Sequence, residues 1–152
     1  MRVERSVTVL NRKARYEYEI LEELEVGMVL TGTEIKAVRT SKVSLAESFC
    51  QFVGGELFAV NIDIAEYRLG SHFNHKSKRD RKLLLHRREL SRWEKKTKDV
   101  GITIVPLKLY INERGIAKMV IALARGKRLY DKRQSIREKE NRRTLDRVIK
   151  KR

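Results

Sequence analysis

Positively charged side chains at the C-terminal end are the first residues that point to a chemistry. Residues 127–152 contain 12 Lys or Arg against 4 Asp or Glu, and neither Gly nor Pro. So few apolar residues cannot build a core, but Lys and Arg bind phosphate through charge and hydrogen bonds. Like-charged pairs four residues apart outnumber opposite ones there. We therefore predict a basic arm, largely disordered when free, that becomes helical when RNA phosphates neutralise it.

A second basic cluster surrounds the apolar residues Leu83–Leu85. Its position favours a phosphate-binding patch, and the alternative is a solvated loop beside a core strand. Tyr16 and His86 are candidates for stacking on unpaired bases or for hydrogen bonding to them. The cluster consists of Lys76, Lys78, Arg79, Arg81, Lys82, Arg87 and Arg88.

Glu34 is an acidic residue inside an apolar stretch that we expect to be a strand. Lys36 follows two residues later, so both side chains would share one face of that strand. They would then form a structural ion pair, or Glu34 would accept hydrogen bonds from a base edge or a 2′-hydroxyl. Both interpretations stay open at this point.

Metal, nucleotide and catalytic sites find little support. His72 and His75 have a His-x2-His spacing, but no second close pair of ligands completes a zinc pattern. Gly126-Lys127 lacks the other residues of a phosphate-binding loop. Cys50 is expected to be a small buried residue. We predict no metal, no cofactor and no enzymatic activity.

Charge is distributed unevenly along the 152 residues. Residues 1–70 carry 9 basic and 11 acidic groups, whereas residues 71–152 carry 27 and 9. One-sided positive charge indicates a polyanionic partner. A lone cysteine and the lack of an apolar run of signal-peptide or membrane-span length indicate a soluble, cytoplasmic protein with no membrane partner. A monomer is expected.

The periodicity predicts a mostly β domain of about six strands and two or three short helices. We expect a capped turn at Asn11, a small antiparallel β-barrel, closed or partly open, and a loop over 66–82; a β-sandwich is the alternative. Gly54-Gly55 predicts a hairpin, Gly27 a break and Pro106 a bulge or an edge strand. Strands are predicted at 16–26, 28–38, 50–53, 56–62, 102–111 and 116–123, and helices at 41–49 and 87–100.

Several strings make the chain resemble the small protein B family, the tmRNA-binding (SsrA-binding) proteins of bacterial trans-translation. The matching strings are NRKARYEYEI (11–20), GMVLTGTEIKAVR (27–39), GGEL (54–57), RKLLLHRREL (81–90), GITIVPLKLYINERG (101–115) and IALARGKRLYDKR (121–133). The resemblance implies an OB-like β-barrel domain over residues 1–130. It also implies a basic tail over residues 131–152 that is disordered when free and helical on the ribosome.

The resemblance further implies an RNA-binding adaptor. Such a protein binds the tRNA-like domain of tmRNA near its D-loop region and delivers tmRNA to stalled ribosomes for ribosome rescue and peptide tagging. Its tail would enter the mRNA channel near the decoding centre. A structural ribosomal protein bound to ribosomal RNA is the alternative function.

Candidate site residues follow from both lines of reasoning. The resemblance implies RNA-binding roles for Asn11, Arg12, Lys13, Arg15, Glu34, Lys36, Leu84, His86, Lys118, Arg125, Lys127 and Arg128. The basic cluster and the aromatic pattern add Arg81, Lys82 and Tyr16, where Tyr16 replaces a common family His and is left with a stacking role. The resemblance also implies tail roles for the Asp131-Lys132-Arg133 element and, by residue type, for Arg137, Arg143 and Arg147.

Overall fold

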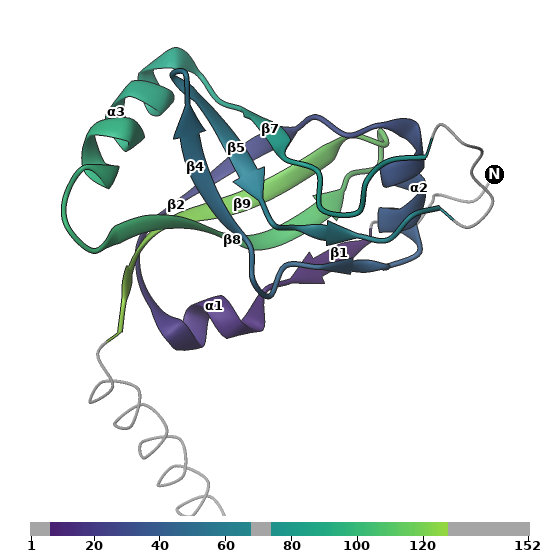
Figure 1. Cartoon of the computed structure of the whole chain (residues 1–152), viewed down its shortest axis with the longest axis horizontal. Helices are drawn as coiled ribbons and strands as arrows, with labels where there is room; N and C mark the ends of the chain where they lie inside the picture. The colour runs from purple at the N-terminus through teal and green to yellow at the C-terminus, as the bar shows by residue number, and fades with distance from the viewer. Residues whose placement is uncertain (1–6, 68–73, 128–152) are drawn as a thin grey trace, which may run out of the picture.

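Strands dominate the computed structural model, which describes residues 7–67 and 74–127 (Figure 1). Three helices lie in these ranges: α1 (Arg12–Glu17), α2 (Gly32–Arg39) and α3 (Arg87–Thr97). The strands are β1 (Thr8–Leu10), β2 (Tyr18–Met28), β3 (Val43–Ser44), β4 (Phe49–Val53), β5 (Glu56–Val60), β6 (Asp63–Ile64), β7 (Arg81–Leu84), β8 (Ile102–Ile111) and β9 (Ala117–Gly126).

The strand pairings close on themselves. The order β8-β4-β5-β7-β2-β9 returns to β8 through a β8–β9 pairing, and β1 joins β8 from outside the ring. All of these pairs are antiparallel, and β3 pairs only with β6. A single ring of pairings differs from the two facing sheets of the sandwich alternative. The pairing between β4 and β8 is short, since these strands pair only at Cys50 and Ile104.

Alternating side chains fill the ring. Met28, Leu109 and Met119 are buried in the main hydrophobic cluster, together with Ile121 and Leu123. Burial of side chains of this size contributes about 1.5–3 kcal/mol each. The interior of the ring is therefore the main source of stability for the surfaces described below.

A β-bulge near Pro106 creates a second, smaller apolar layer. The β8–β9 register shifts between Pro106 and Lys108. Across such a shift the side chains that point inward change from even to odd positions. Val105 and Leu107 therefore point outward, where they pack with Ala14 of α1 in a second cluster. The bulge predicted from Pro106 is confirmed, and it creates the apolar surface on which α1 packs.

The longer helices lie at opposite ends of the strand assembly (Figure 1). Trp93 of α3 is fully buried in the main cluster, and so are Ala37 and Val38 of α2. The α3 prediction is confirmed, but the helix ends at Thr97. The helical pattern over 87–100 predicts Val100 on the same face as Leu90 and Trp93, but Val100 is 98 % exposed because it follows the helix end and precedes a turn at Gly101 (φ +83°).

The region from residue 27 to 49 differs most from the prediction. Gly27 does not break the strand, since β2 continues to Met28. Residues 32–39 form α2 instead of a strand, because Thr31 and Glu34 make a capping box that starts a helix there. The helix predicted at 41–49 is wrong. Ser41 has a φ of 59°, and the chain then forms β3 and turns.

Other elements follow their local signals. The Gly54-Gly55 hairpin is confirmed, with both glycines at positive φ. Asn11 caps α1 as predicted, although the helix extends through Tyr16 to Glu17. The ring has six strands, in line with the estimate of about six, although β7 takes the place of the strand predicted at 28–38. The described residues add β1, β3 and β6, each only two or three residues long. Among the described helices, none is long and apolar enough to cross a membrane.

Candidate nucleic-acid interface

Five residues from five strands form a row across the outside of the ring. Direct cross-strand partners join Thr8 to Tyr110, Tyr110 to Lys118, Lys118 to Gly27, and Gly27 to Leu84. Directly opposed residues share one face of a sheet. Met119 and Met28, which flank members of the row along their strands, point into the core. The side chains of this outer row therefore point away from the core.

A neighbouring set lies beside the outer row on the same face. Lys108 is opposed to Leu10 on one side and to Val120 on the other, and Val120 is opposed to Glu25. The Lys108 Nζ lies 5.1 Å from the centre of the Tyr110 ring. We call these four residues and the outer row the outer face.

Tyr110 lies between Thr8 and Lys118 in the outer row. Partial burial and a hydrogen bond to the Glu25 side chain raise the pKa of its hydroxyl. A neutral ring with a cation against it offers an aromatic surface for a base and a positive charge for a phosphate. The outer face can thus stack a base and hold the backbone beside it.

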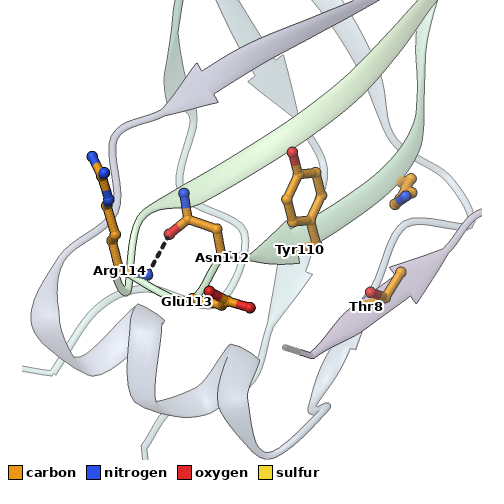
Figure 2. Close-up of a pocket in the computed structure, with 6 residues that line it drawn as sticks. Thr8, Tyr110, Asn112, Glu113 and Arg114 are labelled. Atoms are coloured by element: carbon orange, nitrogen blue, oxygen red, sulfur yellow. Dashed lines mark hydrogen bonds between the residues drawn. The ribbon is translucent and has the colours of Figure 1, made fainter. Parts of the chain in front are cut away.

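Two open hollows flank Lys108. One, about 560 Å³, is lined by Thr8, Tyr110 and Arg114 among others (Figure 2). The Asn112 side chain closes the turn beside it, where its Oδ1 accepts hydrogen bonds from the backbone N–H groups of Arg114 and Ile116, each at 3.0 Å. The second hollow, about 270 Å³, reaches from Lys108 to Arg12 and Arg15 of α1. Both are shallow spaces in which an unpaired nucleotide could lie.

Asn11 lies beneath this surface. Its side chain is buried, and its Nδ2 donates to the carbonyls of Leu45 at 3.1 Å and Pro106 at 2.8 Å. Its Oδ1 accepts from the N–H of Ala14 at 3.3 Å. All polar groups of its amide thus have protein partners. In this structure the Asn11 side chain positions α1, and its RNA contact stays a prediction.

The other α1 candidates are exposed. Arg15 pairs with Glu23 at 2.8 Å, and Tyr16 is 44 % exposed. Lys13 pairs with Glu47 at 2.8 Å, and that hydrogen bond raises the pKa of its ammonium group. Arg12 is exposed and lines the smaller hollow. Charge from α1 is therefore available beside the outer face.

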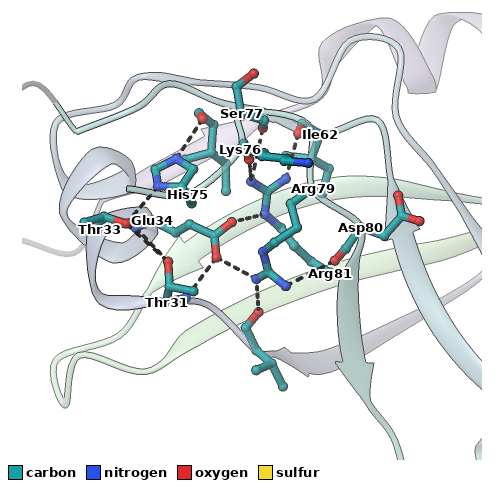
Figure 3. A network of polar contacts seen from close by, with 12 residues as sticks. Thr31, Thr33, Glu34, Ile62, His75, Lys76, Ser77, Arg79, Asp80 and Arg81 are labelled. Atoms are coloured by element: carbon teal, nitrogen blue, oxygen red, sulfur yellow. Dashed lines mark hydrogen bonds and ion pairs between the residues drawn. The ribbon is translucent and has the colours of Figure 1, made fainter. Parts of the chain in front are cut away.

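Glu34 and Arg81 occupy the interior, as Figure 3 shows. Glu34 Oε1 accepts from Arg79 at 2.6 Å and from the N–H of Thr31 at 2.9 Å, while Oε2 accepts from Arg81 Nε. Burial alone would raise the pKa of Glu34, but these hydrogen bonds outweigh it and hold the pKa below its ordinary value. Both side chains are fully buried and their groups are paired within the protein, while their RNA-binding roles stay a prediction.

Lys36 is not the partner of Glu34. The two belong to α2 instead of a strand, and Lys36 is exposed, with its Nζ 5.3 Å from the Tyr67 ring centre. The structural interpretation of Glu34 is therefore retained with different partners, Arg79 and Arg81.

The remaining candidates lie at several places. Lys82 pairs with Glu56 at 2.9 Å, and Leu84 in the outer row is 53 % exposed. The His86 N–H donates to Glu89 at 3.1 Å at the start of α3. Arg125 is opposed to Glu19 near the end of β9, and the Lys127 N–H donates to the carbonyl of Glu17 at 2.9 Å. Outside the described residues lie His72, Arg128, Asp131, Lys132, Arg133, Arg137, Arg143 and Arg147.

The structure also brings in residues that the sequence prediction missed, namely Tyr110, Lys108 and Glu25. Their signal was the two-residue alternation of Lys108 and Tyr110 in the strand predicted at 102–111, opposite Val120 and Lys118 respectively. Pro106 predicted a bulge or an edge strand, but use of the signal also required the cross-strand register, which was not known from the sequence.

Histidine and cysteine have structural environments. His75 is buried, with Nε2 at 2.9 Å from the Ile64 carbonyl and Nδ1 at 2.9 Å from Thr33 Oγ1. Cys50 is buried, and desolvation raises the pKa of its thiol. Within residues 7–67 and 74–127, no three potential metal ligands gather.

Comparisons with known proteins place this geometry in context. The family described as SmpB protein matches residues 8–151. The SsrA-binding protein of Flavobacterium psychrophilum is 51 % identical over 146 residues, which cover 96 % of this chain and 97 % of that protein. The SsrA-binding protein of Bacteroides thetaiotaomicron is 51 % identical over 145 residues, covering 95 % and 97 %.

A solved structure is also similar. It is described as "tmRNA-SmpB: a journey to the center of the bacterial ribosome", and a chain in it is 48 % identical to this one with a TM-score of 0.70. The match covers 86 % of this chain and 95 % of that chain. The family match over residues 8–151 spans the ring and the outer face.

Proposed function

This chain belongs to the SmpB protein family, and we propose that it binds tmRNA and serves as its adaptor on stalled ribosomes in trans-translation. The observation that carries the proposal is the outer row, in which Tyr110 is opposed to Lys118 and only Gly27 separates Lys118 from Leu84. The relatives of this chain are SsrA-binding proteins. The role is binding, and catalysis is not part of it.

The outer face supplies the two kinds of contact that RNA recognition needs. Tyr110 and Leu84 offer aromatic and apolar surface to unpaired bases, such as those of the D-loop region in the tRNA-like domain. Lys108 and Lys118 offer charge to the backbone. We take the ring to be a small OB-like β-barrel, a shape whose outer strands often bind oligonucleotides.

The tail belongs to the second half of the proposal. Residues 131–152 are proposed to enter the mRNA channel near the decoding centre, with Asp131, Lys132 and Arg133 at the entry. The protein would work as a monomer in the cytoplasm, where ribosomes translate.

A binding titration at physiological salt tests the proposal. The full chain is titrated with tmRNA and with an unrelated RNA of equal length, with bulk tRNA as competitor. A preference of at least about 100-fold for tmRNA is expected of specific recognition. Equal affinities that both collapse with salt would reject it and favour the alternative, a structural protein bound to ribosomal RNA. Co-purification with ribosomes separates the two independently, since only a structural protein approaches one copy per ribosome.

A further inference from the structure

A short irregular segment beside the outer face carries three cations. It runs over residues 74–80, and we call it the basic loop. Lys76 and Lys78 are exposed, and the Arg79 side chain is 36 % exposed. The segment contains no helix or strand. Its shape must therefore be set by side-chain contacts.

Those contacts come from below the loop. The Nη2 of Arg81 donates to the carbonyl of Ser77 at 3.1 Å and to that of Lys76 at 3.5 Å. Its Nη1 donates to the carbonyl of Ile62 at 2.7 Å. The Ser77 carbonyl also accepts from the Ile64 N–H at 2.9 Å. The backbone that presents the lysines is thus held by one buried guanidinium group and by β6.

Glu34 holds that guanidinium in turn. Its carboxylate bridges Arg79 at one oxygen and Arg81 at the other (Figure 3). The carboxylate is itself held by the capping box, through the N–H of Thr31. Thr33 adds a tether through His75, at the other end of the loop.

A buried ion network of this kind contributes little stability beyond what apolar side chains of equal volume would give. What it provides here is a fixed position for a loop whose outer side is cationic. A cation held in place before binding loses less conformational freedom when it meets its ligand. In addition, the Arg79 Nε is buried without a partner among the described residues.

We propose that the basic loop is a second RNA-binding site, which takes the phosphate backbone, and that Glu34 is its positioning residue. The inference rests on the proposed function. Arg81, directly after the loop, is the first residue of β7, and Leu84 of the outer row lies three residues further along this strand, roughly 10 Å at 3.3 Å per residue. An RNA bound on the outer face can therefore extend its backbone onto Lys76 and Lys78. The expected source of the phosphates is tmRNA.

Salt dependence of binding tests the loop directly. The double variant K76A/K78A is compared, in the full chain, with K95A/K98A, which removes the same charge from exposed positions of α3 and its C-cap at the other end of the ring. For tmRNA, K76A/K78A should lower the slope of log affinity against log salt by about two, one per phosphate contact. The control should leave the slope near that of the wild type. Equal changes in both variants would overturn the proposal.

A double-mutant cycle tests the positioning role. E34Q removes the charge that holds Arg81. T33V keeps that charge and removes the tether to His75 together with a 3.4 Å hydrogen bond to the Thr31 hydroxyl, so it serves if E34Q does not fold. E34Q and T33V should each weaken tmRNA binding when introduced into the wild type. Introduced into K76A/K78A, they should weaken binding little further, because the loop that they affect has already lost its lysines. Effects that simply add would show that neither acts through the loop.

The two proposals fail differently. If the wild type does not prefer tmRNA to unrelated RNA, the proposed function fails. If it does, but K76A/K78A keeps the wild-type affinity and slope, only the basic loop is rejected. The same variants are titrated with purified ribosomes. A slope change with ribosomes and none with tmRNA would overturn tmRNA as the source of the phosphates.

Discussion

The Asn11 side chain donates a hydrogen bond at 2.8 Å to the carbonyl of Pro106, 95 residues away in the chain. Pro106 stands at the β8 bulge, where the backbone hydrogen-bond ladder shifts. The same amide group also binds Leu45, and it caps α1. One side chain thus fixes the helix that carries Arg12 and Arg15 to the strand that carries Lys108 and Tyr110.

Replacement of Asn11 by Ser separates these tasks. A serine hydroxyl can still cap the helix, but it has no amide to reach the Pro106 carbonyl. The Leu45 carbonyl keeps its hydrogen bonds from the Ser48 hydroxyl and N–H. A buried carbonyl that loses its donor costs about 1–3 kcal/mol, so we expect N11S to lower the free energy of unfolding by about that amount and to weaken tmRNA binding. Urea denaturation followed by the fluorescence of Trp93 measures the first effect. R12A is the control and should weaken binding with a stability change within about 0.5 kcal/mol. A fully stable N11S would contradict the positioning role.

Glu34 makes stability depend on pH in a specific direction. Its pKa is lowered in the folded state, so its contribution is fully present above the unfolded pKa, about 4.3, and is lost as pH falls through the folded value. Removal of one partner of a buried pair costs about 3–5 kcal/mol. We expect the difference in unfolding free energy between wild type and E34Q to be of that size at pH 7 and to shrink as pH falls below about 4.

E56Q is the matched control for that series. Glu56 pairs with Lys82 at the surface, and exposed pairs contribute about 0–1 kcal/mol. The difference in unfolding free energy between wild type and E56Q should be small at every pH from 7 to 3. A difference for E34Q that stays constant over this range would show that the charge of Glu34 is not what stabilises the network.

Tyr110 is expected to be the main stacking residue of the outer face. Stacking of a base on an aromatic side chain is worth about 1–3 kcal/mol, so Y110A should weaken tmRNA binding by roughly 5- to 150-fold. Y110F keeps the ring and loses only the hydroxyl that meets Glu25, so it should bind more like the wild type. F49A removes an exposed aromatic side chain from β4, outside the outer face, and should have no effect. Fluorescence anisotropy with labelled tmRNA distinguishes these outcomes, and equal losses in Y110A and F49A would contradict the assignment.

Local signals in the sequence predicted those elements whose reason is local. Gly54-Gly55 requires positive φ at adjacent residues, which a hairpin provides, and Asn11 caps the residues directly after it. Residues 32–39 show the limit, because their apolar and β-branched residues favour a strand. The capping box of Thr31 and Glu34 and the burial of Val38 against the ring decide for a helix.

The candidate site was less predictable than the fold, since it depends on register. The outer row combines residues from position 8 to position 118, and each joins it through a cross-strand pairing. The family resemblance implied Lys118 and Leu84 as candidates, but neither it nor the sequence pattern placed Tyr110 between Thr8 and Lys118. Burial was equally hidden: Glu34 and Arg81 are charged residues, and only the mutual pairing within the network allows them to be fully buried.

The basic tail, which lies outside the described residues, and the ring should have separate tasks. We expect the ring to bind tmRNA and the tail to act on the ribosome. A chain that ends at Arg133 keeps the outer face and the basic loop, so we expect tmRNA binding to stay within a few-fold of the full chain while peptide tagging on stalled ribosomes is lost. The control carries residues 134–152 in shuffled order, which preserves charge and composition but not the order of apolar and basic positions. A tagging assay with a non-stop mRNA measures both. Tagging by the truncated chain would reject the division of labour. Full tagging by the shuffled chain would show that the tail acts through charge alone.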